Sequence, residues 1–339
     1  MSTENKALIR NKTWDLVILP PNRIHIGCKW VYRIKYNADG SVSRLKERLV
    51  AKAPRAWFAK LSTILLEYGF QFSKLDPSLF IKANSTRCIY VLVYVDDILI
   101  MGSDDCLVDS LVTELNTRFA LKDLGLVYYF LGIQVTRTAA GIHLTQTKYL
   151  QDLLTKAGMK NVNTQSTPMN SGLKLSNYGS EPALDTTLYR SIVGALQYAT
   201  ITRPELFYCV NKVCQYMQTP LLSHWTAVKR ILRYIAGTLD YGLHIKLAHD
   251  FALDVFCDAD QSTVLLATNL VLHARTKNIE IDLYFVRDKV LQQKIQVKHV
   301  PASAQLADFF TKLISSTKFN DFRSKLSVIS LATLSLKGL

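Results

Sequence analysis

Hydrophobic and polar positions alternate in the first part of the chain as they do in β-strands. Residues 29–36 and 48–52 show this alternation on either side of turn-forming residues, which predicts a hairpin. A stronger pair of strands is predicted at 88–102, where two runs of β-branched and aromatic residues flank Asp96 and Asp97. The pattern therefore predicts two hairpins, the second with two adjacent carboxylates at its turn.

Apolar residues recur at helical spacing in the segments between and after these strands. The spacing predicts helices over 54–68, 105–119 and 146–157, and three more within 188–236. Ser223 is the predicted N-cap of the last helix, and Gly237 its predicted end. The stretch 124–135 reads as strand with glycines that allow a bulge. The mixture predicts an α+β protein.

Composition limits the class of protein. The chain has 339 residues, enough for about two domains, and 49% of them are apolar, as in globular proteins. No apolar run is long enough for a membrane span, and the N-terminus does not resemble a signal peptide. None of the six cysteines forms a Cys-x-x-Cys pair. We therefore expect a protein with reduced thiols in the cytoplasm or nucleus, without a membrane partner.

The charge of the chain is strongly positive. Lys and Arg number 41 against 27 acidic residues, which gives a formal net charge of +14. An excess of this size favours a polyanionic partner, most simply a nucleic acid. The basic residues are spread along the chain, so a soluble basic surface is the alternative.

The carboxylates of Asp96 and Asp97 carry the most specific chemistry. Carboxylates at a hairpin tip must be solvated, paired or bound to a cation. Their hard oxygens suit Mg²⁺, which proteins hold with one or two carboxylates plus substrate phosphates. Polymerases use such ions to bind both oxygens of an in-line phosphoryl displacement. An ordinary hairpin with a polar turn is the alternative on spacing alone.

A set of short segments resembles the Pol polyprotein of copia-type LTR retrotransposons. The segments are similar to the reverse transcriptase and ribonuclease H region of that polyprotein, and they follow one another in the order that the family has. Among them are Tyr94-Val-Asp-Asp97 and Thr202-Arg-Pro204. The full set is 27–35, 37–42, 48–52, 53–57, 94–97, 129–135, 189–198, 202–204, 273–277, 299–302, 305–308 and 311–312. These segments cover most of residues 10–330.

The resemblance implies an incomplete right-hand polymerase of fingers, palm and thumb, followed by a truncated ribonuclease H-like domain. The implied divisions are a fingers fragment at 1–52, palm and thumb at 53–165, a helical connection region at 166–249 and the ribonuclease H-like region at 250–339. The implied partners are an RNA or DNA primer–template and deoxynucleoside triphosphates. The oligomeric state is left open.

The resemblance also implies roles for the palm and fingers residues. Asp96 corresponds to the principal Mg²⁺ ligand, and Asp97 to a weaker supporting ligand. Tyr94 corresponds to a residue under the primer terminus. Arg48 and Lys52 correspond to basic residues that face the incoming triphosphate, although a solvated strand face is an equal alternative for both.

Later segments of the resemblance supply four more residues. Tyr129 and Gly132 belong to the segment that corresponds to the region gripping the primer. Asp258 and Asp308 correspond to the first and last metal-binding aspartates of ribonuclease H. Plain surface acids are the favoured alternative for Asp258 and Asp308, because the rest of that acidic cluster has no counterpart.

Two blocks of the family pattern are missing. The segments ending at Lys52 and starting at Ala53 are fused here, whereas the family has between them a palm strand with a third metal-binding aspartate. A second junction, at Asp260–Gln261, lacks the catalytic glutamate and another aspartate of ribonuclease H. A polymerase site needs the third carboxylate to hold two ions. We therefore expect a fragment of a copia-type reverse transcriptase, an RNA-directed DNA polymerase, with an opened palm sheet and little or no catalysis. A nucleic-acid-binding remnant without catalysis and an unfolded pseudogene product are the alternatives.

Overall fold

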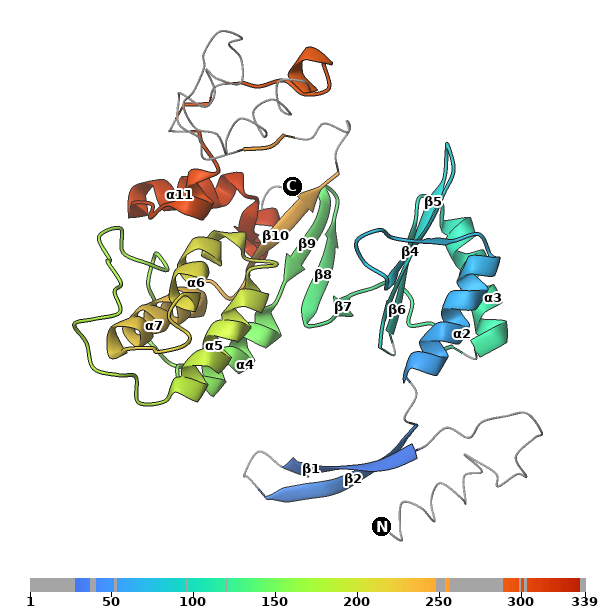
Figure 1. The fold of residues 1–339 in the computed structure, drawn as a ribbon, viewed down its shortest axis with the longest axis horizontal. Coiled ribbons are helices and arrows are strands. Elements are labelled where there is room, and N and C mark those ends of the chain that lie inside the picture. Colours follow the sequence, from blue (N-terminus) through green and yellow to red (C-terminus); the bar gives the residue numbers. More distant parts are fainter. Residues whose placement is uncertain are drawn as a thin grey trace, which may run out of the picture. The chain divides into compact units, whose positions relative to one another are not determined.

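The computed structural model describes residues 28–36, 41–51, 54–95, 97–119, 121–247, 254–256, 289–298, 300–301 and 304–335. The chain divides into two compact units, Met1–Gly125 and Leu126–Leu339, and each is described by itself. The described residues form antiparallel sheets of two, four and five strands together with helices (Figure 1). The predicted mixture of helices and strands is confirmed.

The first unit begins with the predicted hairpin of β1 (Cys28–Tyr36) and β2 (Val42–Ala51). The strands pair in one register from Cys28 opposite Ala51 to Lys35 opposite Arg44, and the register shifts at Tyr36. Lys52 lies outside the described residues.

A four-stranded sheet and two helices form the rest of the first unit. The strands are β3 (Gln71–Phe72), β4 (Leu79–Ala83), β5 (Cys88–Tyr94) and β6 (Asp97–Gly102), in that spatial order. The helices α2 (Pro54–Glu67) and α3 (Asp105–Phe119) lie on one face of the sheet (Figure 1). Both helices and the 88–102 hairpin were predicted from their periodicity.

The core of the first unit lies between these helices and the sheet. Leu61 and Leu65 of α2 and Leu115 of α3 are completely buried against Phe80 of β4 and Val91 of β5. Each such side chain contributes about 1.5–3 kcal/mol through its removal from water. The apolar residues that predict this helix, among them Leu61, Ile64 and Leu65, therefore form part of the core.

The second unit contains the five-stranded sheet, in the order β11–β10–β9–β8–β7. Its strands are β7 (Tyr129–Phe130), β8 (Ile133–Thr138), β9 (Gly141–Thr145), β10 (Tyr241–Lys246) and β11 (Val328–Ser330). The predicted strand over 124–135 is wrong in detail, because the chain turns between β7 and β8 at Leu131 and Gly132, which both have positive φ.

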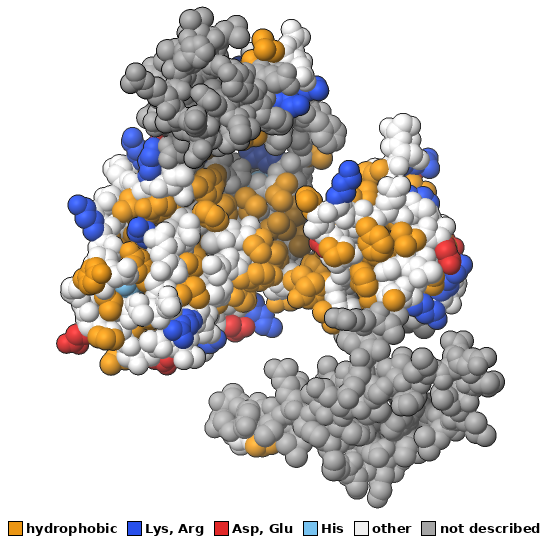
Figure 2. Space-filling model, in the orientation of Figure 1, with side chains coloured by type: hydrophobic (Ala, Val, Ile, Leu, Met, Phe, Trp, Pro, Cys, Tyr) orange, Lys and Arg blue, Asp and Glu red, His pale blue; other side chains and the backbone are white. Residues whose placement is uncertain are grey.

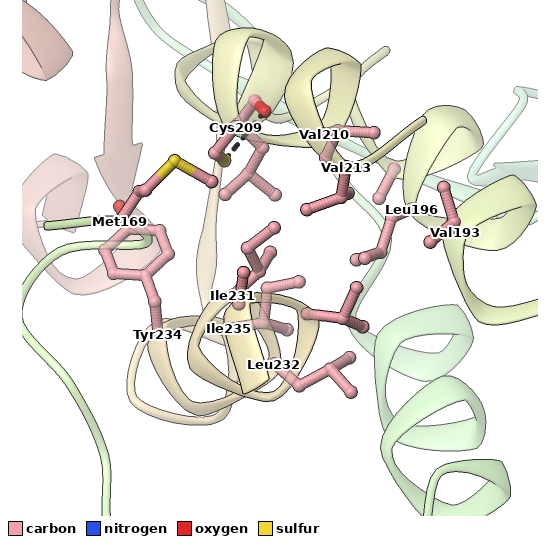
Figure 3. Packing of buried hydrophobic residues seen from close by; sticks show 14 of the residues in the cluster. Met169, Val193, Leu196, Cys209, Val210, Val213, Ile231, Leu232, Tyr234 and Ile235 are labelled. Carbon is pink, nitrogen blue, oxygen red and sulfur yellow. Dashed lines mark hydrogen bonds between the residues drawn. The ribbon is translucent and has the colours of Figure 1, made fainter. Parts of the chain in front are cut away.

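Helices gather around the largest hydrophobic core, in the second unit. They are α4 (Thr147–Lys156), α5 (Thr186–Ala199), the short 3-10 helix η1 (Pro204–Leu206), α6 (Phe207–Cys214), α7 (Leu222–Ala236), α10 (Asp308–Thr311) and α11 (Ser316–Lys325). The short helix α12 (Leu331–Ser335) follows β11. Figure 3 shows Val210 and Val213 of α6 facing Ile231 and Ile235 of α7. The three helices predicted within 188–236 are therefore confirmed.

The C-terminal segment joins the same core. Phe309 of α10 and Phe319 and Phe322 of α11 are almost fully buried in the cluster that contains α5, α6 and α7. The chain then adds β11 to the sheet beside β10. Residues more than 70 positions apart in sequence thus share one core.

The start of α7 differs from the prediction. The helix begins at Leu222, and the N–H of Leu221 donates a 3.0 Å hydrogen bond to Nδ1 of His224, so Ser223 is not the N-cap. The backbone explains the shift, because Leu221 forms a β-bridge with Pro182 and Leu222 N–H bonds to the carbonyl of Glu181. Gly237 is the C-cap, as predicted.

His224 should make the stability of the second unit depend on pH. Its Nδ1 accepts from Leu221, and its Nε2 lies 2.9 Å from the carbonyl of Ser176, so the buried ring is held neutral. Burial lowers the pKa of His224 below the ordinary 6.5, against a smaller rise from the Ser176 carbonyl. Below about pH 6.5 the unfolded chain therefore binds more protons than the folded one, and stability falls as the pH falls.

Thermal unfolding at about pH 7.5 and about pH 5.5 measures this effect. We expect a lower midpoint at the acid pH, and a smaller difference for His224→Gln. Glutamine at this third helical position accepts the same N–H bond as part of a capping box, but does not titrate. Part of the difference should persist, because burial also lowers the pKa of His244. Equal pH dependence of both proteins would contradict this role of His224.

Candidate active site

The hairpin of β5 and β6 has the geometry that the sequence predicts for its tip. Tyr94 and Asp97 are opposite each other and close the turn that contains Val95. Asp97 is exposed and Tyr94 is 50% exposed, so neither side chain belongs to the core. Asp96, the predicted principal ligand, lies outside the described residues.

The turn contains backbone strain. Val95 has φ +53°, in the left-handed region that β-branched residues avoid. The closing turn of a two-residue hairpin requires positive φ, and asparagine, aspartate or glycine usually supply it. Strain of this kind persists where the surrounding structure imposes it, and it concentrates at functional sites.

Replacing Val95 by glycine should relieve the strain. We expect Val95→Gly to raise the free energy of unfolding of the first unit by about 1 kcal/mol, because glycine adopts this conformation without a Cβ clash. Urea unfolding measures the change. The control is Thr86→Gly, at an exposed turn position with ordinary φ, which should lower stability instead. A loss of stability in both variants would show that the turn is not strained.

A third carboxylate is not found near the tip. In the part of the chain that the structure describes, β6 is an edge strand, and no strand beyond it could bring another acid next to Asp97. The same residues contain no group of three or more His, Cys, Asp or Glu side chains placed to hold a metal ion. The described residues thus supply Asp97 as an exposed carboxylate, but not a complete two-metal set.

The predicted fingers residues are only partly placed. Arg48 lies in β2, opposite Val31 of β1. Lys52, between β2 and α2, lies outside the described residues. Their predicted contacts with a triphosphate stay predictions.

The predicted primer-gripping segment forms a turn held by tyrosines of two helices. Tyr129 is in β7, and Gly132 has φ +83° in the turn to β8. The hydroxyl of Tyr198 in α5 donates a hydrogen bond to the carbonyl of Leu131. The ring of Tyr198 packs edge-on against the ring of Tyr149 in α4, with 5.2 Å between the ring centroids. The motifs 129–135 and 189–198, which are separate in sequence, are therefore brought together.

The backbone conformation explains the glycine, because a side chain is strained at φ +83°. A Cβ at Gly132 would lie 3.7 Å from the ring of Tyr198 and 4.0 Å from that of Tyr149, which are ordinary contact distances, so the turn packs against both rings without requiring a glycine there. The Tyr149 hydroxyl donates to the carbonyl of Ala195 at 3.1 Å. Tyr129 itself is 44% exposed, which leaves its ring accessible to a ligand.

The acids predicted for the ribonuclease H-like region are not brought together in the described residues. Asp258 lies outside them. Asp308 begins α10, and its Oδ1 lies 2.9 Å from Nζ of Lys312 one turn later. An i,i+4 ion pair is an ordinary feature of a helix surface.

A buried ion pair was missed by the sequence reasoning. Arg203 and Glu205, on either side of Pro204, have completely buried side chains, with Nε and Oε1 2.6 Å apart. The guanidinium also donates to the carbonyl and the hydroxyl of Thr238, each at 2.8 Å. The only signal was Thr202-Arg-Pro204 as a family motif, without a role. The pair ties η1 to the end of α7.

Comparison with known proteins places these motifs in a family. The sequence profile described as reverse transcriptase (RNA-dependent DNA polymerase) matches residues 51–171. The Pol polyprotein of transposon RE1 of Arabidopsis thaliana is 30% identical over 97% of this chain. A putative transposon Ty5-1 protein of Saccharomyces cerevisiae is 31% identical, over 63% of this chain and 70% of that protein. The chain belongs to the copia-type retrovirus-related Pol polyproteins of transposons.

The chain spans about a third of the RE1 polyprotein, 33% of its length. A mitochondrial protein of Arabidopsis thaliana described as uncharacterized is 46% identical, over 51% of this chain and 71% of that protein. No solved structure matches the chain. The described residues of this copia-type chain include no helix that is long and apolar enough to cross a membrane.

The alignment with the RE1 polyprotein is longer than the chain. It runs over 489 residues, which exceeds the 339 residues of this chain by 150. The copia-type relative therefore holds a large amount of sequence, within the aligned region, that has no counterpart here. The reverse transcriptase match begins at residue 51, beside the predicted junction at 52–53.

Proposed function

We propose that this copia-type chain binds nucleic acid through its reverse transcriptase-derived surfaces and does not polymerise DNA. One observation carries the proposal: among the described residues, the sheet that presents Asp97 ends at β6. Two Mg²⁺ ions in a polymerase are held by carboxylates on neighbouring strands. Without a strand beyond β6, the described residues offer no second strand for that purpose.

The available metal ligands also support the proposal that this chain does not polymerise DNA. Asp96 and Asp97 are the correct ligand type for Mg²⁺, and together they could hold an ion at the turn. Two adjacent carboxylates at one hairpin tip do not bridge two ions between strands. We therefore derive no catalytic step through Mg²⁺ in this chain.

Binding without catalysis has its own support. The net charge of +14 favours attraction to phosphate backbones. The aromatic rings of Tyr94, Tyr128 and Tyr129 are 44–73% exposed and could stack on bases. Each unit has its own buried core, which supports a folded protein over an unfolded pseudogene product.

The salt dependence of binding tests the proposal. For the full chain and a fluorescent RNA–DNA primer–template, we expect log Kd to rise linearly with log salt concentration, with a slope of about 3–6, because bound phosphates release counterions. Arg48→Ala and Lys52→Ala should each reduce the slope by about 1 if these residues contact phosphates. Lys160→Ala, an exposed lysine in the second unit, is the control. Absent or salt-insensitive binding would refute the proposal.

A further inference from the structure

The outer edge of β6 has no paired strand among the described residues. In the part of the chain that the structure describes, β6 pairs with β5 on one side and with no strand on the other. The opposite edge of the sheet, β3, has only two residues, Gln71–Phe72, and offers little to pair with. The six residues of β6, Asp97–Gly102, are long enough to template another strand.

The backbone bonds of β6 can be assigned to its two sides. Ser103 N–H donates to the carbonyl of Cys88 at 3.0 Å, just beyond the end of β6. Opposed residues in an antiparallel pair alternate between exchanging both backbone bonds and exchanging none. The odd-numbered residues of β6 therefore bond to β5, and Ile98, Ile100 and Gly102 direct their N–H and C=O groups to the outer edge.

The sequence of β6 has none of the features that usually prevent an edge strand from pairing with another strand. Edge strands are usually protected by lysine, proline, a bulge or short length. The stretch Ile98-Leu-Ile-Met101 contains no charge and no proline, and the register with β5 is unshifted from Asp97 to Gly102. The only charged residue of the strand is Asp97, at one end.

We propose that β6 pairs antiparallel with β6 of a second copy of this chain, about a two-fold axis at Ile100. Ile98 of one copy then lies opposite Gly102 of the other, and Leu99 lies opposite Met101. The backbone N–H and C=O groups of Ile98, Ile100 and Gly102 then form hydrogen bonds with the strand of the second copy. Asp97 falls opposite Ser103, so the two Asp97 carboxylates stay at opposite ends of the paired strands.

The open face of the sheet favours this register. Leu79, Leu92 and Leu99 form one cross-strand row, and Ile81, Tyr90 and Met101 form the next. By alternation, both rows lie on the face opposite the buried Phe80, Val91 and Val93, away from α2 and α3.

None of these six side chains is fully buried, and Met101 is 46% exposed. Figure 2 shows hydrophobic side chains on the visible surface of this unit.

When the strands pair about Ile100, the row that ends at Leu99 in one copy continues into the row that ends at Met101 in the second copy, and the reverse. The result is an apolar surface that runs without interruption across both sheets. Pairing about Leu99 instead would place Asp97 opposite Met101 and leave Gly102 without a partner. The second copy is therefore the occupant that both the backbone and the side chains fit.

Sedimentation velocity of the full chain, after nuclease treatment, tests the proposal. We expect the mass to rise with concentration from the 38.3 kDa of one chain towards twice that value. Met101→Lys should raise the dissociation constant of the dimer about tenfold or more, because it adds a charge at the paired edge. Gln71→Lys is the matched control, since Gln71 lies in the same row as Met101 but at the opposite edge.

Ile100→Pro supplies an independent variant, because it removes an outward N–H and no bond to β5. We expect it to abolish the dimer while the circular dichroism stays unchanged, and if it fails to fold, Met101→Lys decides. A monomer at every concentration would overturn the proposal. So would a dimer that Met101→Lys weakens no more than Gln71→Lys does.

Discussion

Arg203→Met should destabilise the second unit by about 3–5 kcal/mol, as expected when one partner of a buried ion pair is removed. The side chain of Arg203 is completely buried and donates to Glu205 and to both oxygens of Thr238. Its guanidinium also lies over the rings of Tyr234 and Tyr241, 5.6 and 5.8 Å from their centroids. Methionine fills similar space but makes none of these bonds.

Most of the loss of stability in Arg203→Met should come from the buried carboxylate of Glu205, which loses its charged partner. Oε2 of Glu205 already lacks a hydrogen-bond partner among the described residues, so Oε1 relies on Arg203 and on the Tyr234 hydroxyl at 3.3 Å. Burial by itself lowers the pKa of Arg203, but the adjacent Glu205 carboxylate outweighs it, and the net pKa is raised. Arg203 therefore stays charged in the folded protein.

Urea unfolding followed by circular dichroism measures the loss. The double variant Arg203→Met/Glu205→Leu should recover much of it, since a hydrophobic replacement of both partners removes the stranded charge. Lys312→Met is the matched control, because it breaks the more exposed pair with Asp308 and should cost at most about 1 kcal/mol. Equal effects of Arg203→Met and Lys312→Met would contradict the special role of the buried pair.

Local patterns account for the parts of the fold that were predicted. Helix α2 has its apolar stripe, Pro54 at its first position and Gly69 with φ +83° after its end. The β5–β6 hairpin has two strand-forming runs around a polar turn. Such features are set by residues within a few positions of one another, so a single sequence displays them.

Long-range contacts account for what was missed. The turn at Leu131 places a non-glycine residue at φ +49°, which no local rule predicts, and the contact with Tyr198 in α5 holds it. The start of α7 is fixed by a bridge to Pro182. Arg203 and Glu205 look like surface charges in sequence, and only the packing of η1 against α7 buries them.

The candidate site likewise has features that local sequence predicts and features that it does not. Its residue types and the hairpin could be predicted, because Tyr94 and Asp97 lie in one local motif. The consequence of the missing block could be inferred only from the resemblance, and the edge position of β6 agrees with it. Asp96, Lys52 and Asp258 lie outside the described residues, so their predicted roles stay predictions.

We expect that this chain does not extend primers. Among the described residues, no neighbouring strand adds a carboxylate to the hairpin that carries Asp96 and Asp97, so the ligand set that holds two ions is incomplete there. Loss of such electrostatic stabilisation typically reduces the rate by about 10³-fold for a single interaction, and a missing metal ion removes more than one. Nucleic-acid binding should survive, because it depends on phosphate contacts elsewhere.

Primer extension by the full chain, with Mg²⁺, deoxynucleotides and an RNA-templated DNA primer, tests this claim most directly. An active reverse transcriptase in parallel shows that the conditions support synthesis. We expect no product above that of an Asp96→Asn/Asp97→Asn double variant, and equal primer–template binding by the two proteins. Mg²⁺-dependent extension that the double variant abolishes would contradict this claim.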